Sequence, residues 1–310
     1  MEAEIMKRRV IQIANSTQLV SLPRKWAVQN NIKKGDEVDV VVDGNKIVIS
    51  SDSIQQEETR EIDVSNLGSM ILRYIVALYK KGIDEIKVVF NKPELISSVQ
   101  KVIGKEAVGF EITDQGKDYC IIKHVSGELE DFDPVLRRTM LLLLSMADRS
   151  YEAIKEGKFE QLQNIAFLEE ANNRFTTSCR RFLNKKGYKN PRIVGPLYYI
   201  VEDLENLADQ YKYLCMHLYK FSGKKQKVNK NVLDIYQRVN QLLKTFYEIF
   251  YSFDDKKVAW IGAERKDLVD KIFKIIESNR DPSNFVVLHY LLTIMMKVFC
   301  LVGPAMVVAL

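Results

Sequence analysis

The sequence is poor in the residues that disulfides and zinc sites require, with four cysteines and three histidines among 310 residues. The cysteines lie far apart without a C-x-x-C pair, and no histidine joins them at zinc-ligand spacing. No secretory signal is recognisable at the N-terminus. We therefore expect reduced, mostly buried thiols in a cytoplasmic protein. The four cysteines are Cys120, Cys179, Cys215 and Cys300.

Patterns typical of catalysis are missing as well. We find no glycine-rich loop after a strand and no triad of nucleophile, base and acid. Apolar residues make up 46% of the chain and aromatic residues 10%, which is the composition of a globular protein with room for two or three domains. The sequence therefore predicts a multidomain protein that is not an enzyme and holds no organic cofactor.

Acidic residues are absent from residues 6–35, which carry seven lysines and arginines. Residues 1–53 as a whole hold eight basic and seven acidic residues, because the acids lie toward the two ends of this segment. A long basic stretch without acids is typical of a nucleic-acid-binding surface. The alternative is a plain solvated surface, since 28% of the whole chain is charged.

Signals for short elements follow one another closely in residues 1–53. Arg8–Ile13 alternates between apolar and polar residues, and residues 15–17 favour a turn before a second strand. Pro23 favours a first helical position, and Gly44-Asn45 separates two further strands. Strand, turn, strand, helix and two more strands in about fifty residues bury too little core alone, so we expect an obligate dimer.

This first segment resembles the AbrB/SpoVT/MazE family of swapped-hairpin domains over nearly all of residues 5–51. The phrases S-L-P-R-K-W and I-K-K-G-D-E-V are its most specific part. The resemblance implies that two chains interleave their hairpins into one small β-barrel, which binds DNA through the first hairpin and the helix start. Because some members of this family are antitoxins that also bind a toxin, the resemblance leaves an antitoxin role open. The DNA-contact positions that it implies are Lys7, Arg8, Arg9, Gln12, Ser16, Thr17, Arg24 and Lys25.

Residues 54–130 form a second segment, after a polar, acid-rich linker over Ser50–Arg60. Strand and helix signals alternate in the order β-α-β-α-β-β, with glycines at the ends of both helices. This order predicts a small α/β domain with at least one right-handed crossover. We expect it to be a spacer or a dimerisation module.

Residues 131–310 form a third segment that reads as helix throughout. Three amphipathic runs precede the basic linker Gly223–Asn231, and three follow it. Residues 197–200, with the sequence L-Y-Y-I, align with residues 288–291, L-H-Y-L, at an offset of 91. The pattern predicts an internal repeat and hence two three-helix bundles side by side.

The last apolar run, Phe285–Leu310, is long enough to span a membrane. Lys297 would then lie near its centre at a cost of about 2.5–3.5 kcal/mol, and Gly303-Pro304 would interrupt it. A helix that is buried in the bundle and partly covered by a second subunit is the alternative, and we favour it.

Three carboxylates share one face of the predicted helix over Leu197–Leu214. They are Glu202, Glu205 and Asp209, spaced three and four residues apart. A bound cation would relieve the repulsion among them, and oxygen ligands suit magnesium, manganese or iron. The alternative is an acidic helix face that lies against lysine or arginine side chains of a neighbouring helix.

The phrase Glu205-x-x-x-Asp209 resembles the metal motif of the PhoU family, and the order of helices is similar across the whole third segment. That resemblance implies two three-helix repeats in a regulator of phosphate uptake, each repeat with such a motif. Asp267 and Asp270 of the second repeat are weaker candidate ligands on the same ground.

The second repeat departs from this pattern. Met296 and Cys300 stand where the first repeat has Glu205 and Asp209. Neither side chain suits a hard cation, so we expect a metal in the first repeat alone. The same replacements make the last helix more apolar.

Taken together, the segments resemble archaeal-type phosphate uptake regulators, which join an AbrB-like DNA-binding domain to a PhoU-like helical domain. The resemblance implies a dimeric transcription regulator that responds to phosphate status. One alternative is a PhoU-type interaction protein that docks on a phosphate transporter or sensor without binding DNA. Another is a metal-dependent enzyme or metal store that uses the carboxylates of Glu202 to Asp209.

Overall fold

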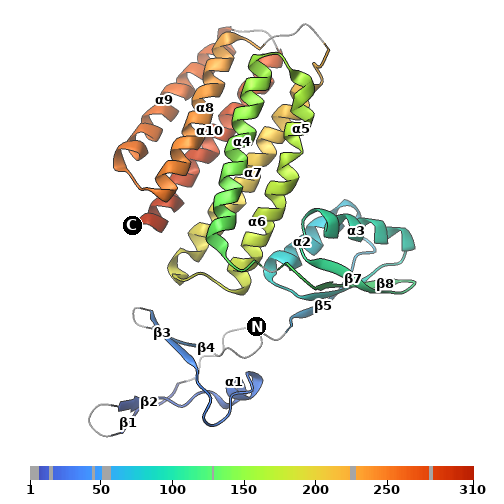
Figure 1. Ribbon diagram of the computed structural model, residues 1–310, viewed down its shortest axis with the longest axis vertical. Helices are drawn as coiled ribbons and strands as arrows, with labels where there is room; N and C mark the ends of the chain where they lie inside the picture. The colour runs from blue at the N-terminus through green and yellow to red at the C-terminus, as the bar shows by residue number, and fades with distance from the viewer. Residues whose placement is uncertain are drawn as a thin grey trace. The chain divides into compact units, whose positions relative to one another are not determined.

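The computed structural model describes residues 7–13, 17–43, 46–50, 57–127, 129–223, 228–278 and 282–310. The chain divides into two compact units, Met1–Glu57 and Glu58–Leu310 (Figure 1). We call them the N-terminal unit and the C-terminal unit and describe each by itself. A small strand domain is thus followed by a largely helical region, as the sequence predicts.

The N-terminal unit consists of two antiparallel hairpins and one short helix. β1 (Ile11–Ile13) pairs with β2 (Thr17–Leu19), and β3 (Asp39–Asp43) pairs with β4 (Lys46–Ser50). Between the hairpins lies α1 (Arg24–Gln29). Pro23 is the residue before this helix rather than its first residue, and no side chain caps it. The order of elements is the predicted one.

The N-terminal unit has no interior of its own, since none of its described residues is buried. Ile11 lies opposite Leu19 on the first hairpin, and Val42 lies opposite Ile47 on the second. Val42 is 72% exposed and Ile47 67% exposed. Apolar faces of this kind gain free energy when a partner covers them, so a single copy of this unit is incomplete.

The C-terminal unit begins with a four-stranded sheet and two helices in the predicted order β-α-β-α-β-β. The sheet order is β5-β6-β8-β7, with β5 parallel to β6 and the other pairs antiparallel. Helices and strands share one apolar core, in which Ile75, Val88 and Ile122 are fully buried. The elements are β5 (Thr59–Asp63), α2 (Ile71–Lys81), β6 (Glu85–Val89), α3 (Ile96–Lys105), β7 (Phe110–Gln115) and β8 (Tyr119–His124), with 3-10 turns at Gly68–Met70 and Pro93–Leu95.

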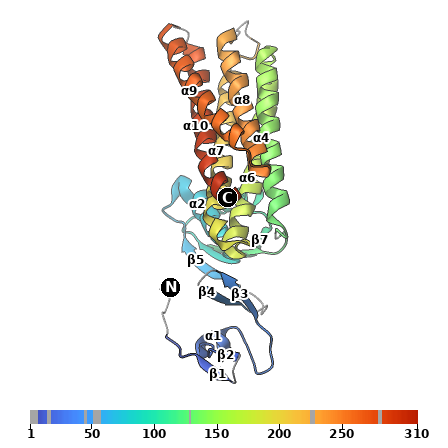
Figure 2. The same ribbon diagram turned by 90° about the vertical axis from the view of Figure 1, so that its left-hand side faces the viewer.

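The helical part follows in the same unit. Its elements are α4 (Phe132–Lys155), α5 (Leu162–Ala166), α6 (Leu168–Lys185), α7 (Val194–Tyr219), α8 (Lys230–Tyr251), α9 (Asp255–Ser278) and α10 (Pro282–Ala309), with 3-10 turns at Phe159–Gln161 and Pro191–Ile193. The second of the three helical runs predicted before the linker covers residues 159–186, and in the structure it is divided at Phe167 into α5 and α6. The helices lie side by side as long rods (Figures 1 and 2).

Two groups of helices share one continuous apolar core. α4, α5, α6 and α7 pack on one another, and so do α8, α9 and α10, while α7–α10 and α4–α8 contacts join the groups. Buried polar bonds fix the α4–α7–α8 junction. The hydroxyl of Tyr211 donates to Asn240 Oδ1 at 2.8 Å, and Asn240 Nδ2 donates to the carbonyl of Ala147 at 2.8 Å. A fully satisfied buried network of this kind favours one register of the helices.

Helix α10 is long and apolar enough to cross a membrane by length and composition, and it is the helix of the described chain that meets this test. In the structure it packs against α7, α8 and α9. Lys297 Nζ lies 3.1 Å from Asp203 Oδ1 of α7, so its charge is paired at mid-helix. The helix is thus part of the bundle, and its cover by a second subunit stays a prediction.

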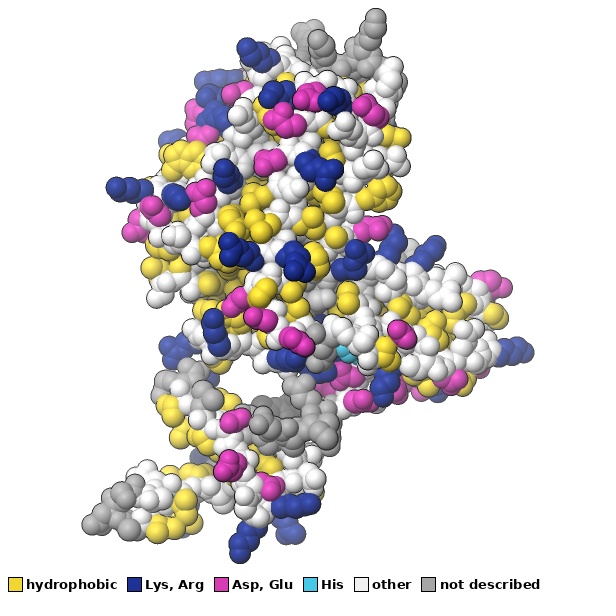
Figure 3. Space-filling view, in the orientation of Figure 1, with side chains coloured by type: hydrophobic (Ala, Val, Ile, Leu, Met, Phe, Trp, Pro, Cys, Tyr) yellow, Lys and Arg dark blue, Asp and Glu magenta, His cyan; other side chains and the backbone are white. Residues whose placement is uncertain are grey.

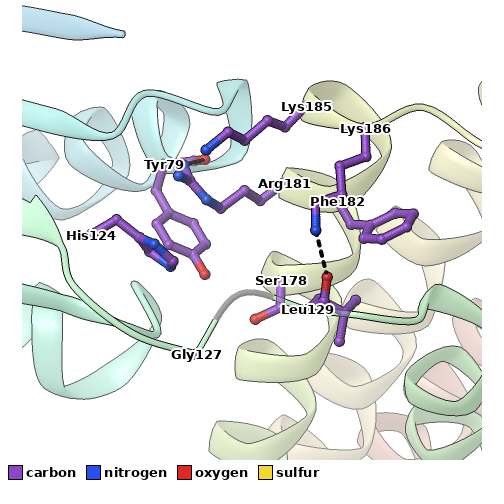
Figure 4. Close-up of a pocket in the computed structure, with 9 residues that line it drawn as sticks. All are labelled: Tyr79, His124, Gly127, Leu129, Ser178, Arg181, Phe182, Lys185 and Lys186. Carbon is purple, nitrogen blue, oxygen red and sulfur yellow. Dashed lines mark hydrogen bonds between the residues drawn. The ribbon is translucent and has the colours of Figure 1, made fainter. Parts of the chain in front are cut away.

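The sheet part and the helical part are joined by a buried arginine of α6. Arg181 donates to the carbonyls of Tyr79 (3.0 Å) and Ile83 (2.7 Å) and to Asp84 Oδ1 (2.6 Å). Its guanidinium also lies 4.9 Å from the centre of the Tyr79 ring. Figure 4 shows Arg181 and Lys185 of α6 reaching the Tyr79 side of the sheet part. The two parts therefore form one compact body.

Candidate functional site

Seven of the eight predicted DNA-contact residues lie in the described part of the chain, and all seven side chains are exposed. Ser16 lies outside the described residues. The exposed seven are Lys7, Arg8, Arg9, Gln12, Thr17, Arg24 and Lys25. Figure 3 shows lysine and arginine side chains on the surface of the N-terminal unit.

The two faces of the first hairpin differ in chemistry. Gln12 pairs with Gln18 across the strands, so these amides share one face, while Ile11 and Leu19 share the other. Arg8 and Arg9 lie just before β1, separated from it by Val10, and the first turn of α1 contains no acidic residue. A polar face flanked by cations suits the phosphates and base edges of DNA, and the apolar face suits a protein partner.

The acidic face of α7 meets a buried arginine from α6. Arg180 is completely buried, and its guanidinium donates to Glu202 and to Glu205. Thr176 Oγ1 donates to Glu205 at 2.8 Å. The guanidinium is buried, Glu205 is 20% exposed and Glu202 is 47% exposed, so the charge-assisted bond to Glu205 is the better shielded of the two.

The third carboxylate of the predicted metal site has a different partner. Lys212 Nζ lies 2.5 Å from Asp209 Oδ1 and 2.9 Å from Glu169 Oε1. Burial raises the pKa of Glu169, although its bonds to Lys212 oppose that shift. Glu205 and Asp209 are thus one turn apart on α7 but belong to two separate ion-pair clusters.

The predicted metal site receives no support from this arrangement. Within the described ranges, no group of three or more His, Cys, Asp and Glu side chains could hold a metal ion. Arg180 pairs with Glu202 and Glu205, Lys80 lies 4.0 Å from Glu205, and Lys212 pairs with Asp209. The ion-paired helix face, which the sequence left as the alternative, is what the structure shows.

The weaker candidates on α9 are separated in the same way. Asp267 Oδ2 lies 2.6 Å from Arg238 and 2.8 Å from Lys271, which lower its pKa by hydrogen bonding. Asp270 is exposed on the same helix. Met296 of α10 holds the position that aligns with Glu205, and Arg265 of α9 donates to its Sδ at 3.4 Å. The second group of helices therefore has an arginine beside a thioether where the first has an arginine beside carboxylates.

A cleft of about 370 Å³ lies between α2, α6 and α7, beside these ion pairs. Its walls carry three cations and four carboxylates, so its charge is nearly balanced. Burial lowers the pKa of Lys80, and the charge of Arg180 adds to this shift. Burial raises the pKa of Glu106, and the charge of Glu205 adds to that one. The charged residues of the wall are Arg73, Lys80, Glu106, Glu169, Glu205, Asp209 and Lys212.

Asp84 connects the helical part to the start of the C-terminal unit. Its Oδ1 accepts from Arg181 at 2.6 Å and from Lys185 at 2.5 Å, and its Oδ2 accepts from the backbone N–H of Glu58 at 3.3 Å. The N–H of Asp84 donates in turn to the carbonyl of Glu58 at 2.9 Å. Glu58 is the first residue of this unit, so Asp84 links helix α6 to the start of the C-terminal unit.

Sequence reasoning missed both arginines of α6, although a signal for Arg180 was present. Thr176, Arg180 and Leu183 are spaced as the buried stripe of an amphipathic helix, and the next helix carries an acidic stripe. A cation on a buried stripe needs an anion nearby, which pointed to an ion pair. No comparable signal linked Arg181 with Asp84, because these residues are 97 positions apart.

Comparison with known proteins adds to the description of the N-terminal unit. Residues 11–56 match the family model described as antidote-toxin recognition MazE, bacterial antitoxin. Neither the curated proteins nor the solved structures include a match to this chain. The match covers the two hairpins and α1, and it supports a swapped-hairpin, AbrB-like domain with a DNA-binding or antitoxin-type regulatory role, a type of domain that binds DNA and dimerises.

Proposed function

We propose that this protein is a cytoplasmic, non-enzymatic transcription regulator that binds DNA as a homodimer through its N-terminal unit. The observation that carries the proposal is the exposed, acid-free basic stretch on a hairpin domain that matches MazE. Its apolar hairpin faces are left for the second copy, as a swapped dimer requires. An antitoxin that binds DNA would share these features. Copurification with a toxin would distinguish an antitoxin from a regulator that acts alone.

We further propose that the C-terminal unit is the effector domain and that the effector reports phosphate status. The resemblance of the helical region to the PhoU family supports this finer proposal. The cleft between α2, α6 and α7 supports the assignment of an effector domain as well, because a ligand bound there would contact both the helical part and the sheet part. In the alternative, this region docks on a phosphate transporter or sensor and the N-terminal unit serves dimerisation only.

Contacts within the C-terminal unit offer a route from the effector domain to DNA. Arg180 and Arg181 are neighbours on α6: the first holds the acidic face of α7, and the second holds Asp84. Asp84 accepts a hydrogen bond from the backbone of Glu58, the residue at which the C-terminal unit begins. A shift of α6 against α7 would therefore reach the attachment point of each DNA-binding half.

Salt-dependent DNA binding tests the proposal. Full-length protein should bind duplex DNA with an affinity that falls steeply as salt rises, because phosphate contacts release counterions. Arg8→Ala, Arg9→Ala and Arg24→Ala should each reduce the slope of log affinity against log salt by about one. Lys101→Ala is the matched control, since it removes an exposed positive charge from α3 instead.

Two outcomes would count against DNA binding by this face. One is unchanged affinity in all three arginine variants, and the other is a wild type that shows no salt dependence. Either result would favour the interaction-protein alternative. If DNA binding holds, mapping of the bound sites across the genome would test whether they lie beside genes for phosphate uptake.

A further inference from the structure

Helix α10 is apolar on all sides but is covered on only one. Its buried stripe follows helical spacing through Val287, Leu291, Ile294, Val298 and Ala305, and this stripe faces α7, α8 and α9. Yet only 44% of its most apolar stretch is buried. A helix without a polar face normally lies in a core, so the exposed apolar side of α10 is a candidate interaction surface.

The outer side forms a continuous apolar strip, which we call the α10 face. Phe299 is 37% exposed and Val307 58% exposed, and Cys300 is exposed between them. A Cβ added at Gly303 would meet nothing within 4 Å, so the backbone there is open to close approach. On α7, Tyr199 extends the strip and is 45% exposed. The face consists of Tyr199, Met296, Phe299, Cys300, Gly303 and Val307.

Charged groups at the borders of the α10 face indicate which kind of partner fits. On one border Lys297 pairs with Asp203 at 3.1 Å, and on the other the Arg265 guanidinium lies 4.7 Å from the centre of the Phe299 ring. Ionised groups beside the middle of the helix are costly in lipid, whereas tyrosine, phenylalanine, methionine and arginine are enriched in protein interfaces. The geometry therefore favours a protein surface over a bilayer.

A second copy of this chain is the partner that the observations favour. The MazE-like N-terminal unit brings two chains together, and seven residues (51–57) separate the end of β4 from Glu58. A short tether keeps the two C-terminal units at an effective concentration in the millimolar range, about the level at which a modest apolar surface associates. Lys297 and Asp203 neutralise each other at one border, so two identical copies meet there without like-charge repulsion.

We infer that the α10 faces of two chains pack against each other around a two-fold axis and form a second dimer contact, separate from the hairpin domain. This inference rests on the proposed function only in requiring the N-terminal unit to dimerise. Its consequence is that the two effector domains act as one body. Each pair of DNA-binding halves is then attached to a single paired scaffold.

Cys300 provides a direct test because the other three cysteines are buried. In full-length wild type, Cys300 should react with a bulky maleimide about tenfold more slowly than in the Phe299→Glu or Val307→Glu variants. A glutamate in the centre of the face should separate the two copies there, while the hairpin domains keep the dimer mass unchanged. Leu141→Glu is the matched control, because Leu141 is a 47% exposed leucine on α4, outside the α10 face.

A second measurement avoids reliance on reactivity alone. A spin label on Cys300 should give a narrow distance distribution between the two chains in the wild type and a broad one in Phe299→Glu. Fast labelling of Cys300 in a wild-type dimer, equal to that of the variants, would overturn the inference and leave DNA binding untouched. A monomeric wild type would overturn the dimeric function and this inference together. If the wild type cosediments with lipid vesicles and the Phe299→Glu variant does not, the α10 face binds a membrane surface, and the inference of a second copy is overturned.

Discussion

The two units of the chain differ in how they hide their apolar residues. The C-terminal unit has two complete cores, one in the sheet part and one shared by the helices, and buries even arginines with their partners. The N-terminal unit buries none of its described residues and leaves valines and isoleucines exposed on both hairpins. The N-terminal unit therefore needs another molecule to cover its apolar residues, whereas the C-terminal unit buries its core residues by its own contacts.

This difference separates two kinds of function. A unit without its own interior can exist only as part of an assembly, and the assembly fixes the spacing of its basic residues, as DNA binding requires. A unit with its own interior can change shape and stay folded, which is what the role proposed for the C-terminal unit requires. The following predictions test this contrast, beginning with the largest expected effect.

The largest effect is expected when the open apolar surface of the N-terminal unit is made polar. Ile47→Asp should abolish dimer formation through the hairpins, because a carboxylate would have to be buried unpaired in the shared core. Light scattering of the full-length protein should then report a lower mass than that of the wild type. Val125→Asp, at a 47% exposed valine of the C-terminal unit, should leave the mass unchanged. A dimer of undiminished mass in Ile47→Asp would contradict the swapped-hairpin arrangement.

The second effect concerns the joint inside the C-terminal unit. Arg181→Met should lower the free energy of unfolding by about 3–5 kcal/mol, since it leaves buried Asp84 and two carbonyls without their main donor. Arg149→Met, at an exposed arginine of α4, is the control and should change stability little. Chemical denaturation followed by circular dichroism measures both. If the two variants were equally stable, the joint between the sheet part and the helices would be unimportant for stability.

The third effect distinguishes an ion-paired acidic face from a metal site. Arg180→Met should destabilise the protein by about 2–4 kcal/mol, because Glu202 and Glu205 lose their partner while Glu205 stays mostly buried. Adding Glu202→Gln and Glu205→Gln to this variant should recover much of the loss. Millimolar magnesium or manganese should not raise the melting temperature of the wild type. A metal-dependent rise that the Glu205→Gln change removes would restore the metal interpretation.

The smallest effect is expected at Glu106, in the cleft. Burial and the charge of Glu205 raise its folded pKa, so the folded state holds its proton more tightly than the unfolded state does. Its contribution to stability is therefore lost as pH rises from its unfolded pKa of about 4.3 through the raised folded value. Glu106→Gln should stabilise the protein at pH 7 by about 0.5 kcal/mol or less, with no gain below pH 4. Thermal unfolding across this pH range would show the difference, and a variant that is less stable than wild type at pH 7 would refute it.

Local structure could largely be predicted from the sequence. The order of strands and helices in residues 7–50 and 59–124 follows from alternation and turn residues, and the structure has that order. Gly82 ends α2 as predicted, whereas Gly104, which was expected to end the next helix, lies inside α3. The six helical runs were visible from their periodicity, although the break at Phe167 was not. Surface exposure of the basic residues also followed from the sequence, because lysine and arginine are rarely fully buried.

The partners of charged residues could not be predicted in this way. Glu205 and Asp209 share a helix face by spacing alone, but spacing cannot show that Arg180 approaches one and Lys212 the other. The same holds for Lys297, whose partner Asp203 is 94 positions away. Electrostatic character depends on neighbours within a few ångströms, and those neighbours come from other helices.

The sequence alone is enough to assign most strands and helices, to place a basic stretch without acids within residues 6–35, and to indicate that the hairpin domain is too small to stand alone. These properties depend on residue order and on the amount of apolar surface. Only the tertiary structure decided that the acidic face is ion-paired, that Arg181 joins the helices to Asp84 and Glu58, and that α10 keeps one apolar side exposed. These properties depend on how helices pack in space, because a charge or an apolar side chain acquires its role from the atoms that surround it.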